Sequence, residues 1–315
     1  MFLRVLFLWV VIIFNQSSVV WACESCSIAR LGRDDGAIIS ESQDKKWSFK
    51  YLYENQNWHE KDAREGHNLH HQGHHFHDKT SEERHHFVLG NRLSDRLSVS
   101  AEVPYTAIYS LEIDDHTILG TKQKSIGLGD LKWVGDYRVF NKKRRSLSVL
   151  GGVKLPTGAT KERNSKGARF EPELQPGSGS YDYLAGVAYR QEEGRVGTVG
   201  NLVYVLRTRG AQEFRYGDVV STSLAVDYLL NPNDDRFQTR IGLDGNVQYE
   251  QKQRADGVEV RDSGGVTFLL GPTVSIKKGE HVSVSGSYHA PVAQELGGVH
   301  QRLDFAWTLG SVVKW

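Results

Sequence analysis

The region that most constrains the fold is residues 146–190, in which two alternating segments flank a long polar connection. In the first segment Leu147, Val149 and Val153 share one parity, while Ser148 and Lys154 share the other. In the second, one parity carries an apolar row made of Tyr181, Tyr183, Ala185, Val187 and Tyr189. Successive side chains of a β-strand point to opposite faces, so each segment predicts a strand with one apolar wall and one polar wall.

The rest of the chain repeats this unit and predicts about twelve strands. One is expected from about residue 85 to 91. Another is expected around residues 131–139, after a polar loop. The connections alternate between long and short. Bacterial outer-membrane barrels have an even number of strands, short periplasmic turns and long external loops. We therefore expect an all-β fold, a transmembrane antiparallel β-barrel of about twelve strands with periplasmic termini and long external loops. A soluble β-sandwich is the alternative, but its turns would be short at both ends.

Residues 1–22 have the pattern of a signal peptide. Arg4 supplies positive charge, residues 5–14 are apolar, and Ala22 is the small residue expected at a cleavage site. An uncleaved membrane helix is the alternative. The expected domains are the signal peptide, a periplasmic segment 23–45, and a barrel from 46 to 315 in the outer membrane of a Gram-negative bacterium. The formal net charge of +1 gives no indication of a nucleic-acid partner.

Three ordered motifs beyond about residue 120 resemble a known family. They are residues 127–131 (GLGDL) followed by Tyr137-Arg138, residues 151–158 (GGVKLPTG), and residues 177–182 (GSGSYD). Together they resemble the outer-membrane barrels named for the MetA pathway of phenol degradation. The resemblance implies a transporter-like barrel and no catalytic residues. The aromatic terminus at Trp315 is similar to the signal read by the barrel-insertion machinery, which we expect as a partner beside outer-membrane lipid.

The polar parity of the strands carries charges of both signs, and these residues are expected to line the lumen. Twelve strands lie between the filled eight-stranded barrels and the open pores of sixteen or more. Paired charges would either seal the lumen or line a narrow path for a small molecule or ion. The expected lumen-lining residues are Lys50, Glu102, Asp130, Lys132, Asp136, Arg138, Lys154, Asp182, Arg190, Asp227, Arg240, Asp244 and Asp304.

Residues 59–86 contain nine of the 13 histidines and are expected to form, in part, a His-rich external loop. Neutral imidazole binds Zn, Cu and Ni, so such a loop could gather several ligands around one ion. The alternative is a solvated loop of low complexity without a fixed site. The candidate metal ligands are His67, His70, His71, His74, His75 and His77.

Cys23 and Cys26 form a C-x-x-C pair at the expected mature start. A disulfide is the first interpretation in an oxidising envelope. A soft-metal thiolate pair and a lipid on Cys23 remain open.

An enzyme is not expected. Ser287 and His289 share a strand face, as a nucleophile and base could, but that face points to the lumen rather than to lipid. The sequence therefore favours a channel for small solutes, with no required cofactor. The alternative is a protein whose His-rich loop captures Zn, Cu or Ni while the barrel serves as an anchor.

Overall fold

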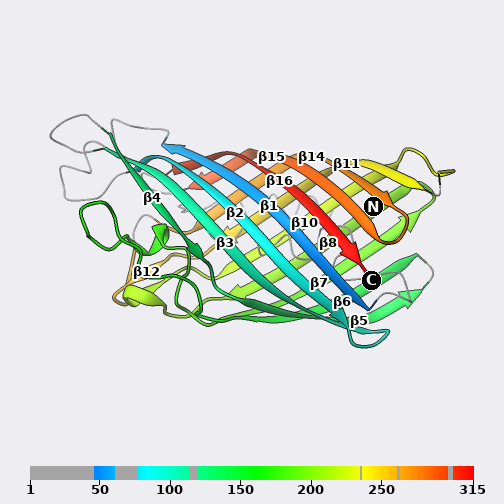
Figure 1. The fold of residues 1–315 in the computed structure, drawn as a ribbon, viewed down its shortest axis with the longest axis horizontal. Coiled ribbons are helices and arrows are strands. Elements are labelled where there is room, and N and C mark those ends of the chain that lie inside the picture. Colours follow the sequence, from blue (N-terminus) through cyan, green and yellow to red (C-terminus); the bar gives the residue numbers. More distant parts are fainter. Residues whose placement is uncertain are drawn as a thin grey trace, which may run out of the picture.

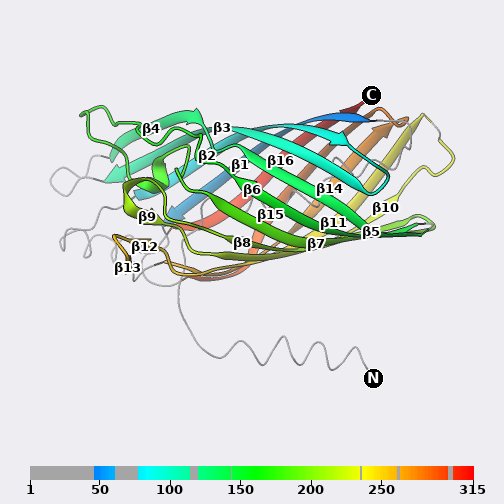
Figure 2. The same cartoon turned by 90° about the horizontal axis from the view of Figure 1, so that it is seen from below.

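A computed structural model describes residues 46–60, 77–113, 120–142, 144–234, 236–260, 263–296 and 301–315. These residues form a closed antiparallel barrel with strongly tilted strands (Figures 1 and 2). Among them, no helix has the length and apolar character needed to cross a bilayer. The wall strands are β1 (Trp47–Glu60), β2 (His77–Arg92), β3 (Leu97–Ile113), β4 (Gly120–Leu128), β5 (Lys132–Lys142), β6 (Arg145–Lys154), β7 (Asp182–Glu193), β8 (Val196–Leu206), β10 (Val219–Leu229), β11 (Phe237–Glu250), β14 (Gly265–Lys278), β15 (Val282–Leu296) and β16 (Gln301–Lys314).

The barrel closes because β1 pairs with both β2 and β16, and β2 also pairs with β3. Two strands share one position in the wall. β3 pairs with β5 through residues 97–102 and with β4 through residues 105–113. The 13 strands of the sheet therefore occupy twelve positions around the barrel. This confirms the expected barrel and its even number of wall positions, and the soluble sandwich is wrong.

Both ends of the barrel chain meet at the periplasmic rim. The amide of Trp315 donates to the carbonyl of Trp47 at 3.0 Å, and the Trp47 amide donates to the Trp315 carbonyl at 3.0 Å. The short connections, such as residues 93–96 and 279–281, lie at this rim. The long connections 155–181 and 207–218 and the described residues 251–260 lie at the opposite, external end (Figures 1 and 2). They carry the short elements η2 (Pro172–Leu174), η3 (Ala211–Glu213), β9 (Phe214–Arg215), β12 (Arg254–Ala255) and β13 (Val258–Glu259).

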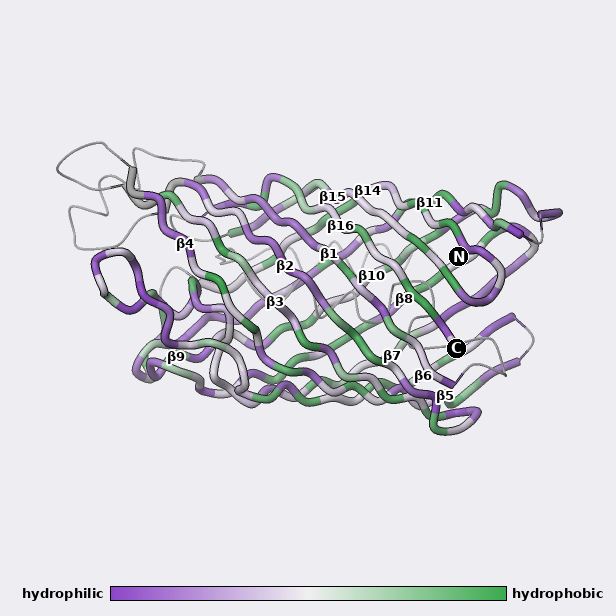
Figure 3. Tube along the Cα trace, viewed as in Figure 1, coloured by the Kyte–Doolittle hydropathy of each residue, from purple (hydrophilic) through white to green (hydrophobic). Residues whose placement is uncertain are grey.

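The two faces of the wall have opposite character. Figure 3 shows hydrophobic (green) and hydrophilic (purple) residues alternating along the strands. Outward apolar side chains are exposed, among them Val149 (47%), Leu224 (56%) and Leu243 (59%). Inward polar side chains such as Ser148 and Asp244 are fully buried. An apolar outer surface around a polar interior is the arrangement that lipid on the outside requires.

Two segments differ from the sequence expectation. β2 begins at His77 rather than near residue 85, so His85 and His86 belong to the wall and not to a loop. β4 was expected to be a polar loop. Both segments carry polar side chains on both faces near the external end, so no apolar row marks them as strands.

Candidate functional site in the barrel lumen

The lumen contains most of the charged residues that the sequence placed on the inner face. Arg138, Arg190, Asp227 and Arg240 are partly buried on β5, β7, β10 and β11, as is Lys132 on β5. The fully buried members are Lys50, Glu102, Asp130, Asp136, Lys154, Asp182 and Asp244. Charges taken out of water in such numbers are tolerated only when partners compensate them.

Asp304 lies elsewhere. Its side chain is 39% exposed and contacts the imidazole of His59, which is 41% exposed. The register between β1 and β16 shifts, because Asn57 pairs with Phe305 and Trp58 pairs with Leu303. Asp304 is skipped in this pairing, so the inward and outward positions of β16 are exchanged there. Leu303 is buried for the same reason (2% exposed).

One buried cluster joins β1, β2, β3 and β5 around His86. Its Nδ1 lies 2.8 Å from Glu102 Oε1, and its Nε2 lies 3.6 Å from Glu54 Oε2. The ammonium of Lys132 is 3.2 Å from the same Glu102 oxygen. Glu54 and His86 are at most 3% exposed. The cluster therefore balances two carboxylates with one ammonium and an imidazole inside the wall.

A second cluster is built around Asp130, between β4 and β5. The carboxylate accepts hydrogen bonds from the Gly158 amide (2.8 Å), the Ser178 amide (2.9 Å) and the Ser178 hydroxyl (2.6 Å). The Lys154 ammonium lies 3.3 Å from Asp130 and 2.7 Å from Asp182. The three sequence motifs at residues 127–131, 151–158 and 177–182 thus converge on one carboxylate, and we call this arrangement the Asp130 junction.

Two glycines are required by the close chain approach at the Asp130 junction. A Cβ added at Gly177 would lie 2.6 Å from Gly158 Cα, and a Cβ added at Gly158 would lie 2.7 Å from Gly177 Cα. Both contacts are with backbone, which cannot rotate away. The two external segments therefore cross at a distance that only glycine permits.

The Asp130 junction holds residues 170–176 across the external half of the lumen. Gln175 donates to the Phe170 carbonyl at 2.9 Å, and the Tyr216 hydroxyl donates to the Pro172 carbonyl at 2.9 Å. Phe170 and Leu174 pack against Ile108 of β3. These contacts fix the connecting segment against the wall rather than leaving it in solvent.

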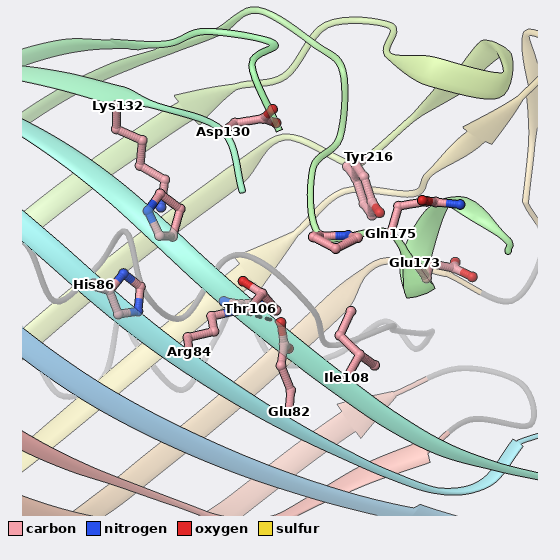
Figure 4. Close-up of a pocket in the computed structure, with 12 residues that line it drawn as sticks. Glu82, Arg84, His86, Thr106, Ile108, Asp130, Lys132, Glu173, Gln175 and Tyr216 are labelled. Carbon is pink, nitrogen blue, oxygen red and sulfur yellow. Dashed lines mark hydrogen bonds and ion pairs between the residues drawn. The ribbon is translucent and has the colours of Figure 1, made fainter. Parts of the chain in front are cut away.

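A narrow cavity remains between this segment and the wall (Figure 4). Its volume is about 20 Å³, which is space for about one water. Wall residues Glu82, Arg84 and His86 line it from β2, and Glu173 and Gln175 line it from the connecting segment. We call this narrow cavity the constriction.

A wider cavity of about 470 Å³ opens at the periplasmic end. Its titratable lining residues are Arg144, Arg190, Arg240, Lys277, His281, Lys314, Glu192 and Glu280. Arg240 is paired with Asp227 (2.5 Å) and Glu192 (3.4 Å). Cationic groups outnumber carboxylates in this cavity even with Asp227 counted, and we call it the vestibule.

Two further buried pairs strengthen the wall. His289 Nε2 lies 2.5 Å from Asp244 Oδ2, with both side chains fully buried. Ser287 exchanges a hydrogen bond with Thr308 at 2.6 Å rather than with His289. Buried Arg207 lies 3.5 Å from Glu250, which is on β11 as Asp244 is, and over the ring of Tyr216. These pairs cross-link neighbouring segments in the lumen.

The metal and thiol predictions concern residues that are mostly outside the described part of the chain. This holds for Cys23, Cys26, His67, His70, His71, His74 and His75, and for the expected signal peptide. His77 begins β2, and its side chain is not described. Within the described ranges, no group of three or more His, Cys, Asp or Glu side chains could hold a metal ion.

Sequence reasoning missed the partners that come from the connecting segments. Ser178, Gln175 and Tyr216 occupy polar loops without periodicity, so nothing marked them as luminal. The only available signal was the clustering of Gly, Ser and Pro in the motifs, which indicates a built loop but not its location.

Comparisons with solved structures give the same architecture. The chain is similar to the COG4313 outer membrane channel from Pseudomonas putida F1, with 17% identity, a TM-score of 0.61, and coverage of 88% of this chain and 98% of that one. It is also similar to the β domain of the Bordetella autotransporter BrkA, at 9% identity, TM-score 0.50 and coverage of 86% and 100%. The CymD monoaromatic hydrocarbon channel matches at 11% identity and TM-score 0.44, over 91% and 93% of the two chains.

The first two likenesses, with TM-scores of 0.61 and 0.50, show that the chain has the fold of outer-membrane β-barrels. No curated protein sequence matches the chain at a significant level. The model of one family, described as "Putative MetA-pathway of phenol degradation", matches residues 92–298, a range that contains the Asp130 junction and its three motifs. Because the match spans well over half of the sequence, the chain belongs to that family.

Proposed function

We propose that the protein conducts small solutes through its lumen and favours anions over cations. The observation that carries the proposal is the vestibule, a cavity of about 470 Å³ at the periplasmic end with an excess of Arg and Lys. A low-dielectric wall lined by one sign of charge concentrates the opposite ion inside it. Small anions would therefore collect in the vestibule and cations would be depleted.

The constriction limits what can pass. Its volume of about 20 Å³ has room for about one water between the wall and residues 170–176. A larger solute can pass between this segment and the wall only by displacing the segment, which the Asp130 junction and Tyr216 hold in place. The proposed channel consequently has a low conductance at rest and selects first by size.

Neighbouring lysines on β14 provide a matched test of the vestibule. Lys277 lies on the inner face and lines the vestibule, whereas the adjacent Lys278 is exposed on the outer face over the ring of Phe237. Lys277→Gln and Lys278→Gln remove the same charge at the same height. The reversal potential of reconstituted barrels in a salt gradient measures the anion preference directly.

We expect Lys277→Gln to move the reversal potential towards the cation side and Lys278→Gln to leave it near the wild-type value. The double variant Arg190→Gln with Lys277→Gln should move it further. Equal reversal potentials for all four proteins would remove the vestibule from the account, and a barrel that passes neither ions nor small solutes would remove the channel.

A further inference from the structure

The outer face of β2, β3 and β4 carries lysines near the external end of the barrel. Lys79, Lys122 and Lys124 are exposed, and they alternate with the buried inward residues Gln123 and Ser125 on β4. Figure 1 shows these three strands side by side, and β4 lies at the external end of the barrel. These cations therefore point away from the lumen and play no part in the proposed conduction path.

Strand register places the lysines around a small apolar floor. Leu111 of β3 pairs with Lys79 on one side and Lys122 on the other. One step along, Tyr109 pairs with Lys124, whose ammonium lies 5.2 Å from the centre of the Tyr109 ring. Strand spacing puts Lys79 and Lys122 about 10 Å apart, and Lys122 and Lys124 about 7 Å apart. Three cations thus surround Leu111 and Tyr109, and we call this surface the lysine patch.

The lysine patch lies just above the apolar band of the wall. The row of outward residues formed by His85, Tyr105 and Leu128 lies towards the periplasm, and the rings of His85 and Tyr105 are 6.2 Å apart. His85 also contacts Tyr51, whose hydroxyl is 2.8 Å from its Nδ1. Amphipathic rings of this kind collect at the level where hydrocarbon gives way to headgroups. Lys124 is two rows of outward residues beyond these rings, and Lys79 and Lys122 are three rows beyond. The lysines therefore lie at headgroup height in the external leaflet.

We propose that the lysine patch binds a phosphorylated lipid headgroup of the external leaflet, of the phosphorylated glucosamine type found in lipopolysaccharide. Clusters of lysines beside the apolar surface of a membrane protein attract anionic headgroups. Lysine is a strong point-charge partner for phosphate, and the Tyr109 ring and Leu111 would contact the adjoining sugar and acyl groups. Two described carboxylates face outward near the lysine patch. Glu83 of β2 lies on the periplasmic side of Ser81, and Asp304 of β16 contacts His59, which pairs with Lys79.

Matched triple variants test the proposal on the full-length barrel. Lys79→Gln, Lys122→Gln and Lys124→Gln together remove the lysine patch. Lys142→Gln, Arg145→Gln and Lys278→Gln together remove the same charge from exposed positions at the periplasmic end. Both proteins are purified in detergent with a divalent-cation chelator, and the retention of diphosphorylated lipid A is measured by native mass spectrometry and titration.

We expect the patch variant to bind diphosphorylated lipid A roughly 100-fold more weakly than wild type, since each of the three lysines near the surface contributes about fivefold. The periplasmic variant should bind as wild type does, and lipid A without phosphates should bind weakly to every protein. Lys122→Gln alone should lose about fivefold. Heat-modifiable migration on electrophoresis verifies that each variant is folded.

Equal affinity of the two triple variants would overturn the proposal. Equal binding of phosphorylated and phosphate-free lipid would also overturn it. So would complete displacement of the lipid by inorganic phosphate at the same concentration as the lipid, because the patch would then be a general anion site. Reversal potentials of the patch variant keep the two proposals separate, since loss of lipid binding should leave ion flux unchanged.

Discussion

Replacement of Asp130 by Ala should release the external segments from the wall. Asp130 is 2% exposed and accepts three hydrogen bonds from Gly158 and Ser178, while it shares the Lys154 ammonium with Asp182. Breaking a buried charge pair costs about 3–5 kcal/mol when the remaining charge has no other partner. Lys154 retains Asp182, so we place the loss at about 3 kcal/mol, at the lower end of that range.

Amide hydrogen exchange measures this loss where it occurs, because the connecting segments can open without unfolding the barrel. A loss of about 3 kcal/mol corresponds to roughly 150-fold faster exchange at the Gly158 and Ser178 amides if opening is at equilibrium. The conductance of the reconstituted barrel should rise as the constriction widens.

The control is Asp95→Ala in a periplasmic turn, where the carboxylate is 94% exposed and pairs with Arg92. This exposed pair should contribute less than about 1 kcal/mol and change neither exchange at Gly158 nor conductance. Equal exchange rates in the two variants would refute the argument that Asp130 holds the external segments together.

Three further perturbations have defined outcomes. Val149→Arg, on the lipid-facing wall, should lower the free energy of unfolding in urea by about 2–4 kcal/mol if the position lies near the bilayer midplane, and an unchanged value would contradict the assigned facing. Gly177→Ala should lower the free energy of unfolding by about 1–3 kcal/mol because the added Cβ would meet the Gly158 backbone. Gly135→Ala should be nearly neutral, since the nearest atom to its added Cβ is 3.7 Å away. Similar unfolding curves for the two variants would argue against the close crossing of residues 158 and 177. If the histidines at 67–77 bind Zn or Ni, affinity measured by calorimetry on the full chain should fall as pH drops through about 6.5, since protons compete for the imidazole nitrogens; pH-independent binding, or equal binding after the six are changed to Ala, would remove this prediction.

The alternation of residues was sufficient to predict the wall wherever a strand lies within the bilayer. Residues 146–154 and 182–190 each show an apolar row against a polar row, and both are strands with that facing. The signal is strong there because lipid on one side and the lumen on the other impose opposite requirements on successive residues.

The same reasoning failed where the wall extends beyond the hydrocarbon core of the bilayer. In β4, Lys122 and Lys124 face outward while Gln123 and Ser125 face inward, so both parities are polar and the segment reads as a loop. The first half of β2 has the same character. Once hydrocarbon no longer covers the outer face, the physical cause of alternation is absent.

The Asp130 junction could not be derived from local pattern. The motifs showed that residues 127–131, 151–158 and 177–182 are unusual, but their meeting depends on contacts between segments 20 or more residues apart. A periodic pattern reports which face a side chain occupies and not which distant chain it contacts. Most of the lumen-facing charges were thus predictable, while their partners in the connecting segments were not.

Solute flux through the wild-type barrel in liposomes is the most direct test of the central claim that the charged lumen is a conduit. The account predicts a slow flux of small anions that exceeds the flux of cations of similar size and rises when Asp130 is replaced by Ala. Vesicles that stay as tight as protein-free ones, with both proteins correctly inserted and folded, would contradict it.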